Sequence, residues 1–414
     1  MTRLGREETL PMEGPLSGFK VVELAMWVAG PATAAVLGDW GADVIKLEDP
    51  NGGDPIRGMI TRTTSNPELH VRPPYELDNR NKRSVAVDVR KPEGHGFALR
   101  IIDSADVFVT SLRLDALERM RLDFATLAAR NPRLVYASLN GYGHRGPDRL
   151  RPAYDYAAAW ARSGLMATIQ EPGFPPPAQR PAMIDHAAGL GLAGAISAAL
   201  LARQRTGRGC DVTVSLFSMG LWMNATDLTI GLMTGRAPES EGRTQRINPL
   251  WSSYRCKDGK WIYFVMVQAD RFWKPFCEAL GHREWVEDPR FAHAGVRAKN
   301  CAAMTALIDQ VVATRAREEW TPVFDSHELI WAPVNTDAEV LNDPQAHAIG
   351  AFGAVDHPTV PGSRVVNSPI EFGAFQPKPH RVAPELGQHT EEVALEVGLS
   401  WDEIGRLKQA HAIL

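Results

Sequence analysis

The sequence predicts an α/β fold, in which an open, mostly parallel sheet of Rossmann-like type carries helices on both faces. Two observations predict it. Residues 19–25, 29–40 and 41–48 read as strand, helix and strand, which is one βαβ unit. The same alternation continues to residue 139, and alternation over such a length is typical of a doubly wound sheet.

The other elements of this region follow from local signals. Pro31 and Pro92 each lie in the first turn of an expected helix, where a missing N–H costs nothing. Residues 218–234 are rich in Met, Leu and Trp, which is more typical of a core or interface helix than of a cofactor-binding segment. The remaining expectations are strands at 81–88, 105–110, 134–139 and 212–217, helices at 92–104, 114–121, 124–131 and 155–168, and an exposed connector at 171–177.

A second pattern begins near Leu250. Asp258-Gly259 separates two strand-like segments and predicts a hairpin. Beyond it the sequence predicts helices at 271–281, 299–314 and 316–327, a strand at 330–335, then Pro-rich strands and a terminal helix at 401–412. We therefore expect one large domain built from residues 1–225 and 336–414, with a linker and a smaller α+β domain inserted at 226–335.

The composition argues against several classes of function. A net charge of −4 gives no general reason to bind nucleic acid or an anionic membrane, and no apolar run approaches membrane-spanning length. Residues 1–15 read as a loose arm that lacks the apolar core of a signal peptide. The four cysteines form no C-x-x-C pair and the twelve histidines no H-E-x-x-H motif, so no metal site is indicated. We expect a soluble, cytoplasmic protein without a metal.

Asp185 stands at the start of an almost wholly apolar helical segment that ends at Thr206-Gly-Arg-Gly. This position predicts the N-cap of a buried helix, a role that contributes about 1 kcal/mol. The segment also contains Gly189, Gly191 and Gly194, and each glycine costs about 1 kcal/mol in a helix interior. Three such costs indicate that something approaches the helix backbone closely. A carboxylate at a helix N-terminus is also held ionised, as a carboxylate nucleophile requires, so both interpretations stay open.

The same glycines form a G-x-G-x-x-G pattern, the fingerprint of dinucleotide-binding turns. The context argues against that function, because the fingerprint needs a strand running straight into its first glycine. Residues 180–184 are short and contain a proline. The acidic residue at the right distance, Asp211, begins the next strand instead of ending it.

A series of short motifs runs in order along nearly the whole chain. The motifs lie at residues 16–24, 29–31, 41–48, 52–55, 81–84, 91–94, 105–109, 117–119, 131–134, 141–147, 206–209 and 386–391. Each motif is weak alone, but together they resemble the family III CoA-transferases, which include formyl-CoA:oxalate and crotonobetainyl-CoA:carnitine CoA-transferases. The resemblance implies a homodimer whose subunits interlock like linked rings. It also implies that coenzyme A and acyl-CoA are substrates and that no cofactor is permanently bound.

The resemblance further implies roles for individual residues. Asp185 matches the family's nucleophilic aspartate. The positions where the family contacts CoA are Val28, Ala29, Val87, Arg90, Ser111, Arg113 and Arg119. Two departures put the details of CoA binding in doubt: Asp49 stands where the family is often basic, and residues 110–115 replace the usual Glu-Asn-Phe-Arg-Pro-Gly.

In the implied reaction, Asp185 attacks the thioester carbonyl of an acyl-CoA and forms a mixed anhydride. The released CoA thiolate then forms an aspartyl-CoA thioester, from which an acceptor carboxylic acid receives CoA. The loop at 242–249 lacks the glycine run of the oxalate-type enzymes, which favours an acyl group larger than formate or oxalate. Arg243 or Arg246 is either a contact for the acceptor carboxylate or part of a mobile basic loop.

The same family contains 2-methylacyl-CoA racemases, which exchange the proton beside the thioester. Those enzymes need a histidine directly before the aspartate of the motif that reads here as Pro152-Ala-Tyr-Asp-Tyr156. Tyr154 occupies that position, and an ordinary tyrosine with a pKa near 10 is a poor proton-exchange partner at neutral pH. Transferase activity is therefore favoured over racemase activity. His186 or His144 as a substitute base, and a CoA-binding protein without catalysis, are the remaining alternatives.

Overall fold

The computed structural model describes residues 14–59, 72–373, 375–379 and 381–414. The predicted arm at 1–15 therefore falls almost wholly outside the described residues. Contacts divide the chain into two compact units. The first contains Met1–Ala167, Ala178–Ala237 and Ala348–Leu414, and the second contains Thr168–Pro177 and Pro238–His347.

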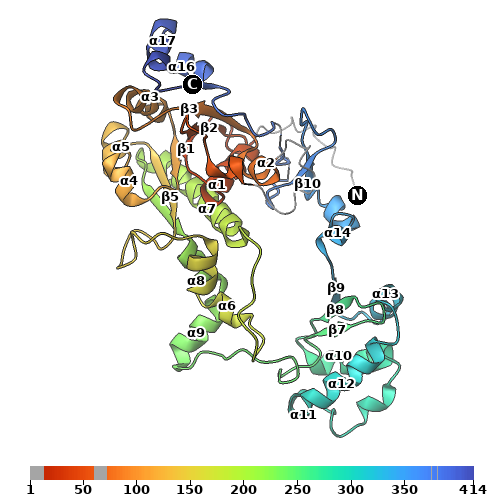
Figure 1. The fold of residues 1–414 in the computed structure, drawn as a ribbon. Coiled ribbons are helices and arrows are strands. Elements are labelled where there is room, and N and C mark those ends of the chain that lie inside the picture. The colour runs from red at the N-terminus through yellow and green to blue at the C-terminus, as the bar shows by residue number, and fades with distance from the viewer. Residues whose placement is uncertain (1–13, 60–71, 374, 380) are drawn as a thin grey trace, which may run out of the picture. The chain divides into compact units, whose positions relative to one another are not determined.

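The first unit is built on a six-stranded, wholly parallel sheet (Figure 1). The strands are β1 (Lys20–Leu24), β2 (Asp43–Glu48), β3 (Lys82–Ala86), β4 (Val107–Thr110), β5 (Val135–Asn140) and β6 (Asp211–Ser215). Their order is β3-β2-β1-β4-β5-β6, as in dinucleotide-binding doubly wound sheets. The chain moves outward in opposite directions from the neighbours β1 and β4, so the topological switch point lies between these two strands.

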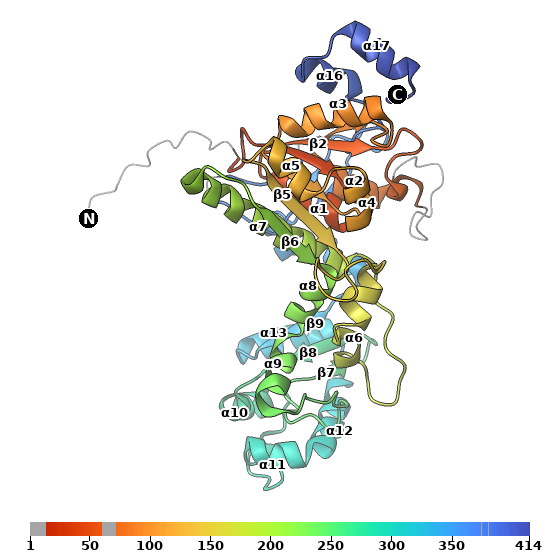
Figure 2. The same ribbon diagram turned by 90° about the vertical axis from the view of Figure 1, so that its left-hand side faces the viewer.

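Alternate strand residues feed two separate cores, one on each face of the sheet. Val21 and Val107 are paired across β1 and β4 and pack with helices α1 (Ala29–Asp39) and α7 (Met183–Thr206). Their neighbours Val22 and Phe108 face the other way and pack with α3 (Pro92–Asp103). Figure 2 shows α3 and the pair α1 and α7 on opposite sides of the sheet. The predicted helices on both faces are therefore confirmed.

The other elements of the first unit are mostly short. They are η1 (Pro55–Gly58), α2 (Pro73–Asn79), α4 (Leu114–Arg119), α5 (Phe124–Arg130), η2 (Tyr156–Ala161), α6 (Leu165–Thr168), α8 (Leu216–Met223), α9 (Ala225–Thr234), β10 (Phe352–Ala354), β11 (Arg364–Val366), α16 (Thr390–Glu396) and α17 (Trp401–Gln409). Two expected helices are interrupted. The helix at 155–168 is a π-helical turn, η2, followed by α6, and the helix at 218–234 breaks at Asn224 into α8 and α9.

The second unit has its own aromatic core around a three-stranded antiparallel sheet. The predicted hairpin is present as β7 (Ser253–Arg255) and β8 (Trp261–Phe264), and β8 also pairs with β9 (Trp331–Val334). The helices are α10 (Ala269–Ala279), η3 (Arg283–Val286), α11 (Ala294–Lys299), α12 (Cys301–Val312), α13 (Arg317–Ser326), α14 (Asp337–Val340) and α15 (Pro344–Ala348). Our sequence-based boundaries of 225/226 and 335/336 place α9 with the insertion, whereas the contacts group it with the first unit.

Helix α7 corrects one expectation. Its 24 residues are long and apolar enough, by length and composition alone, to cross a membrane, so the statement that no apolar run approaches that length is wrong. One face of α7 packs in the sheet core through Ile184, Leu192 and Ile196. Packing of this kind is typical of a core helix, and a core helix can be as long and as apolar as a membrane-spanning one.

Candidate active site

Asp185 lies in the first turn of α7, but it does not cap the helix. The cap position is Ala182, whose φ of 71° places it in the left-handed region. The alanine side chain forms no hydrogen bond to the first turn of the helix. The first helical hydrogen bond runs from the His186 N–H to the Ala182 carbonyl, at 3.0 Å. The predicted N-cap is therefore wrong by three residues, because a strained alanine begins the helix instead of the aspartate.

The close approach predicted from the glycines occurs at Gly189, one turn after Asp185. A Cβ added there would lie 3.0 Å from the Ala29 carbonyl oxygen and 3.2 Å from the Thr33 nitrogen, so α1 packs directly on the backbone of α7. At Gly194 an added Cβ meets nothing within 4 Å, so the explanation fails there. The contact brings the N-terminal parts of α1 and α7 together, beside the carboxyl ends of the strands.

The Asp185 carboxylate lies in an acidic, half-buried environment. Within the described part of the chain it accepts no hydrogen bond. Burial, and next the charge of Asp155, raise the pKa of Asp185 to about 7, although His186 acts in the opposite direction. The expectation that the helix N-terminus holds this group fully ionised is wrong, because burial and the charges of Asp155 and Asp78 raise its pKa.

Asp155 substitutes for the missing cap. Its side chain is 3% exposed, and its Oδ2 accepts a hydrogen bond from the Ile184 N–H at 3.4 Å. The Ala182 amide also bonds to it. Burial raises the pKa of Asp155, whereas these two amide bonds lower it. A carboxylate at the start of η2 therefore holds the turn that presents Asp185.

His186 is paired with a buried carboxylate on another helix. Its Nε2 lies 3.0 Å from Oδ1 of Asp78, at the end of α2. Burial lowers the pKa of His186, but the hydrogen bond and the charge of Asp78 outweigh it and the pKa is raised. The pair fixes the orientation of the imidazole ring beside Asp185 and favours its protonated form.

A buried ionic network holds the turn between β1 and α1. Lys46 donates to Glu23 at 2.7 Å and to Asp54 at 3.0 Å, and all three side chains are fully buried. Asp54 also accepts the N–H of Trp27 at 3.0 Å. Trp27 has a φ of 69°, a strained value for a residue with a side chain. The second strained turn of the site is thus also held by a buried aspartate.

A pocket of about 160 Å³ opens at the switch point of the sheet. It is lined by residues that follow four adjacent strands, among them Met26 after β1, Asp49 after β2, Arg90 after β3 and Leu112 after β4. Crevices at the carboxyl ends of strands, where the strand order reverses, are the usual ligand sites of open α/β sheets.

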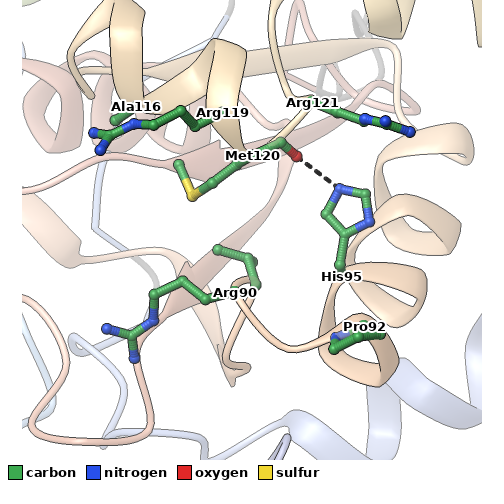
Figure 3. Close-up of a pocket in the computed structure, with 8 residues that line it drawn as sticks. Arg90, Pro92, His95, Ala116, Arg119, Met120 and Arg121 are labelled. Atoms are coloured by element: carbon green, nitrogen blue, oxygen red, sulfur yellow. Dashed lines mark hydrogen bonds between the residues drawn. The ribbon is translucent and has the colours of Figure 1, made fainter.

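A larger neighbouring pocket of about 570 Å³ shares Val89, Arg90 and Met120 with the first. Figure 3 shows the side chains of Arg90 and Arg119 on either side of Met120, with His95 bonded to the Met120 carbonyl. Arg121 also lines this pocket. Three arginines around one open pocket suit a ligand with several negative charges.

The structure brings together part of the predicted CoA-binding set. Val87 and Arg90 line the smaller pocket, and Arg119 lines the larger one. Ser111 lies beside them, because its hydroxyl accepts the Met26 N–H at 3.0 Å. Arg113 instead pairs with Asp115 and donates to the Leu150 carbonyl.

The other two predicted contacts, Val28 and Ala29, lie at the start of α1 and line neither pocket. Asp49 also has a clear role in the structure: its carboxylate lies 2.8 Å from the Arg90 guanidinium, which additionally bonds to Asp88. The departure noted in the sequence therefore partly neutralises one predicted phosphate contact.

The remaining candidates have other partners. Tyr154 is 63% exposed and packs edge-on against Trp27, with ring centroids 5.8 Å apart. His144 bonds to Ser138 at 2.9 Å, at the end of β5. In the second unit, Arg243 binds Asp309 through both of its terminal nitrogens, so its guanidinium is already paired.

Sequence reasoning missed Asp155, Asp78 and Asp54 as parts of the site. The burial of a polar side chain by distant parts of the chain is not visible in a pattern of residues, and Asp155 and Ile184 are 29 positions apart along the chain. The glycines of the G-x-G-x-x-G pattern lie inside α7, so they form no phosphate-binding turn. No cluster of metal-ligating side chains occurs among the described residues.

Comparisons with known proteins agree with the fold. The sequence model of CoA-transferase family III matches residues 16–390. An (R)-2-hydroxy-4-methylpentanoate CoA-transferase of Clostridioides difficile is 32% identical over 96% of this chain and 99% of its own length. A cinnamoyl-CoA:phenyllactate CoA-transferase of Clostridium sporogenes is 31% identical over 96% of this chain and 97% of its own length. The crystal structure of a CaiB/BaiF family protein from Brucella suis matches with a TM-score of 0.82 and 31% identity, covering 93% of this chain and all of that one.

Proposed function

This chain belongs to CoA-transferase family III and is a CoA-transferase, and we propose that Asp185 is its nucleophile. The observation that carries the proposal is the position of Asp185: a half-buried carboxylate without a hydrogen bond from any described residue, at the carboxyl edge of the sheet, beside the turn between β1 and α1. A carboxylate without donors keeps its electron pairs available for attack.

The proposed reaction begins when an oxygen of Asp185 bonds to the thioester carbonyl carbon. The C–S bond breaks, its electron pair leaves on sulfur, and an aspartyl anhydride and CoA thiolate result. The thiolate then attacks the aspartyl carbonyl, releases the acyl group as a carboxylate and forms an aspartyl-CoA thioester. The acceptor carboxylate then attacks the aspartyl-CoA thioester, which gives a second anhydride and releases CoA thiolate. The thiolate attacks the acyl carbonyl of the acceptor, which forms the new acyl-CoA and releases Asp185 as a carboxylate.

The acidic surroundings of Asp185 favour this course. Anhydride formation exchanges a carboxylate for a thiolate, and thiols ionise with a pKa near 8.5, against 3.9 for an ordinary aspartate. A pKa of about 7 brings Asp185 closer in basicity to the leaving thiolate. The first step is therefore less unfavourable than it would be for an ordinary aspartate.

We place the nucleotide part of CoA in the two pockets around Arg90 and Arg119. Their guanidinium groups suit its phosphates, and the pockets lie on the same edge of the sheet as Asp185. Val28, Ala29, Ser111 and Arg113 remain proposed CoA contacts further along that edge. We also propose an interlocked homodimer located in the cytoplasm, with acyl-CoA as a substrate and no permanently bound cofactor.

For the acyl group we propose a branched or aromatic carboxylic acid. The names of the two relatives contain 2-hydroxy-4-methylpentanoate in one case, and cinnamoyl and phenyllactate in the other. In this chain the exposed rings of Trp27 and Tyr154 pack on each other near the Asp185 turn and offer an apolar surface of suitable chemistry.

One incubation in heavy water tests the proposed transfer against the racemase alternative. Purified protein is mixed with a 2-methylacyl-CoA and a panel of free acids, including formate, oxalate, 4-methyl-2-hydroxypentanoate and phenyllactate, and the CoA esters are analysed by mass spectrometry. We expect new CoA esters of the larger acids without deuterium. Deuterium in the original ester with no transfer would contradict the proposal and assign proton exchange to this site.

A further inference from the structure

The turn that presents Asp185 depends on a residue to which the proposed function gives no role. Ala182 is held in the left-handed region, which costs about 1–2 kcal/mol for a residue with a side chain. Nothing in the local sequence compensates for this cost, since α7 has no side-chain cap of its own. The carboxylate of Asp155 bonds to the amides on both sides of this strained start, at Ala182 and Ile184.

Asp155 also acts on Asp185 through charge. It is nearly fully buried, so water screens its charge poorly. Its carboxylate is close enough to Asp185 to be the largest charge acting against the ionisation of that group.

We infer that Asp155 is a positioning residue for the proposed nucleophile: it fixes the first turn of α7 and holds a second negative charge against Asp185. This inference rests on the proposed function of Asp185. Two roles meet in one carboxylate, because the group that orders the turn also keeps the nucleophile basic. A neutral cap would order the turn equally well but would leave Asp185 a weaker base.

The other charges facing Asp185 limit the alternatives. Asp78 approaches from α2 and acts in the same direction as Asp155, but more weakly. His186, on α7 itself, acts in the opposite direction, and Arg80, which follows α2, acts on His186. Asp155 is thus the one group of this set that both bonds to the α7 turn and opposes the charge on Asp185.

The variant that separates the two roles is Asp155→Asn. Its amide oxygen still accepts the Ile184 N–H, whereas the charge is gone. Asp123→Asn is the matched control, because Asp123 caps α5 through the Thr126 N–H at 3.1 Å and is a capping aspartate away from Asp185. Asp155→Ser serves as a second neutral cap, and circular dichroism shows whether each variant is folded.

The measurement is the ionisation of Asp185 itself, followed by infrared difference spectroscopy of the protonated carboxyl band between pH 4 and 9. Subtraction of the Asp185→Asn spectra identifies that band. We expect Asp155→Asn to move the midpoint toward lower pH by about one unit, the effect of removing a nearby like charge, and Asp123→Asn to leave it unchanged. The acid limb of acyl transfer should move with it.

An unchanged midpoint in folded Asp155→Asn and Asp155→Ser would overturn the inference. The spectroscopic readout does not depend on activity. A shifted midpoint in a protein that transfers no CoA would therefore disprove the proposed function while leaving the electrostatic role of Asp155 intact.

Discussion

The Asp185 turn and the Arg90–Arg119 pocket lie on the same edge of one sheet but are built in opposite ways. The Asp185 turn and the neighbouring turn between β1 and α1 are held by buried aspartates from other parts of the chain, which bond to their strained residues Ala182 and Trp27. The pocket is formed by long basic side chains that are 61% and 74% exposed, with acidic partners at the surface. The comparison teaches that buried charge holds the proposed nucleophile, whereas the proposed site for the anionic CoA presents exposed, solvated charge.

The difference implies that substitutions in the two regions differ greatly in effect. We expect the largest effect for Asp185→Asn, which should lower the rate of CoA transfer about 1,000-fold or more because an amide cannot form the anhydride. Binding of CoA, measured by calorimetry, should remain within a few-fold of the wild type. Full activity in this variant would remove Asp185 from the chemistry.

Next in size is the loss of Asp54, the carboxylate shared by Lys46 and the Trp27 amide. Asp54→Ala leaves the buried Lys46 paired only with Glu23, which is also paired with Lys82, and we expect a loss of about 3–5 kcal/mol in the free energy of unfolding. Denaturant unfolding measures it. Asp103→Ala, which breaks the exposed pair with Arg130, should cost less than about 1 kcal/mol. Equal losses would mean that burial of the network does not matter.

A smaller effect is an increase in stability, which we expect for Asp185→Asn at high pH. The folded pKa of Asp185, about 7, lies above its unfolded value, so the protonated side chain favours the folded state and this contribution is lost as pH rises through 7. Asp185→Asn carries no such charge. We expect it to be more stable than the wild type at pH 8 by about 1–3 kcal/mol, with the difference shrinking as pH falls toward 4. Thermal unfolding across this range would contradict the account if the two curves ran parallel.

The smallest effects belong to the pocket. Arg90→Ala and Arg119→Ala should each raise the KM for acyl-CoA about 3–10-fold and leave kcat nearly unchanged, because each removes one solvated charge of several. The effect should weaken with added salt. Arg100→Ala, on α3 and paired with Glu403, is the matched control and should change neither constant. A large fall in kcat at Arg90 would mean that the pocket is as rigid as the Asp185 turn.

The sheet was predictable because its signals are local. Each of the six strands is a short segment that contains valine, and the alternation of these segments with helices leads to a parallel sheet with two cores. The structure also brings Val87, Arg90 and Arg119 to two adjoining pockets, whereas their contact with CoA stays a prediction. Residues that follow parallel strands meet at one edge, whatever the details of the loops.

The Asp185 turn was only partly predictable because its determinants are tertiary. The residues of α7 predict a cap at Asp185, but the packing of Ala182 and the carboxylate of Asp155 decide where the helix begins. The sign of the pKa shift was wrong for the same reason: the helix dipole is visible in the sequence, whereas burial and the charge of Asp155 are not. Local patterns drew attention to Asp185 but did not predict its ionisation.

The central claim is that Asp185 carries CoA covalently during transfer, and trapping that intermediate tests it most directly. The protein is mixed with an acyl-CoA, quenched in acid within one turnover, digested and analysed by mass spectrometry. We predict a CoA thioester on the peptide that contains Asp185, absent in Asp185→Asn and discharged by adding the acceptor acid before the quench. Transfer of CoA with no adduct, or with an adduct on another carboxylate, would contradict the account.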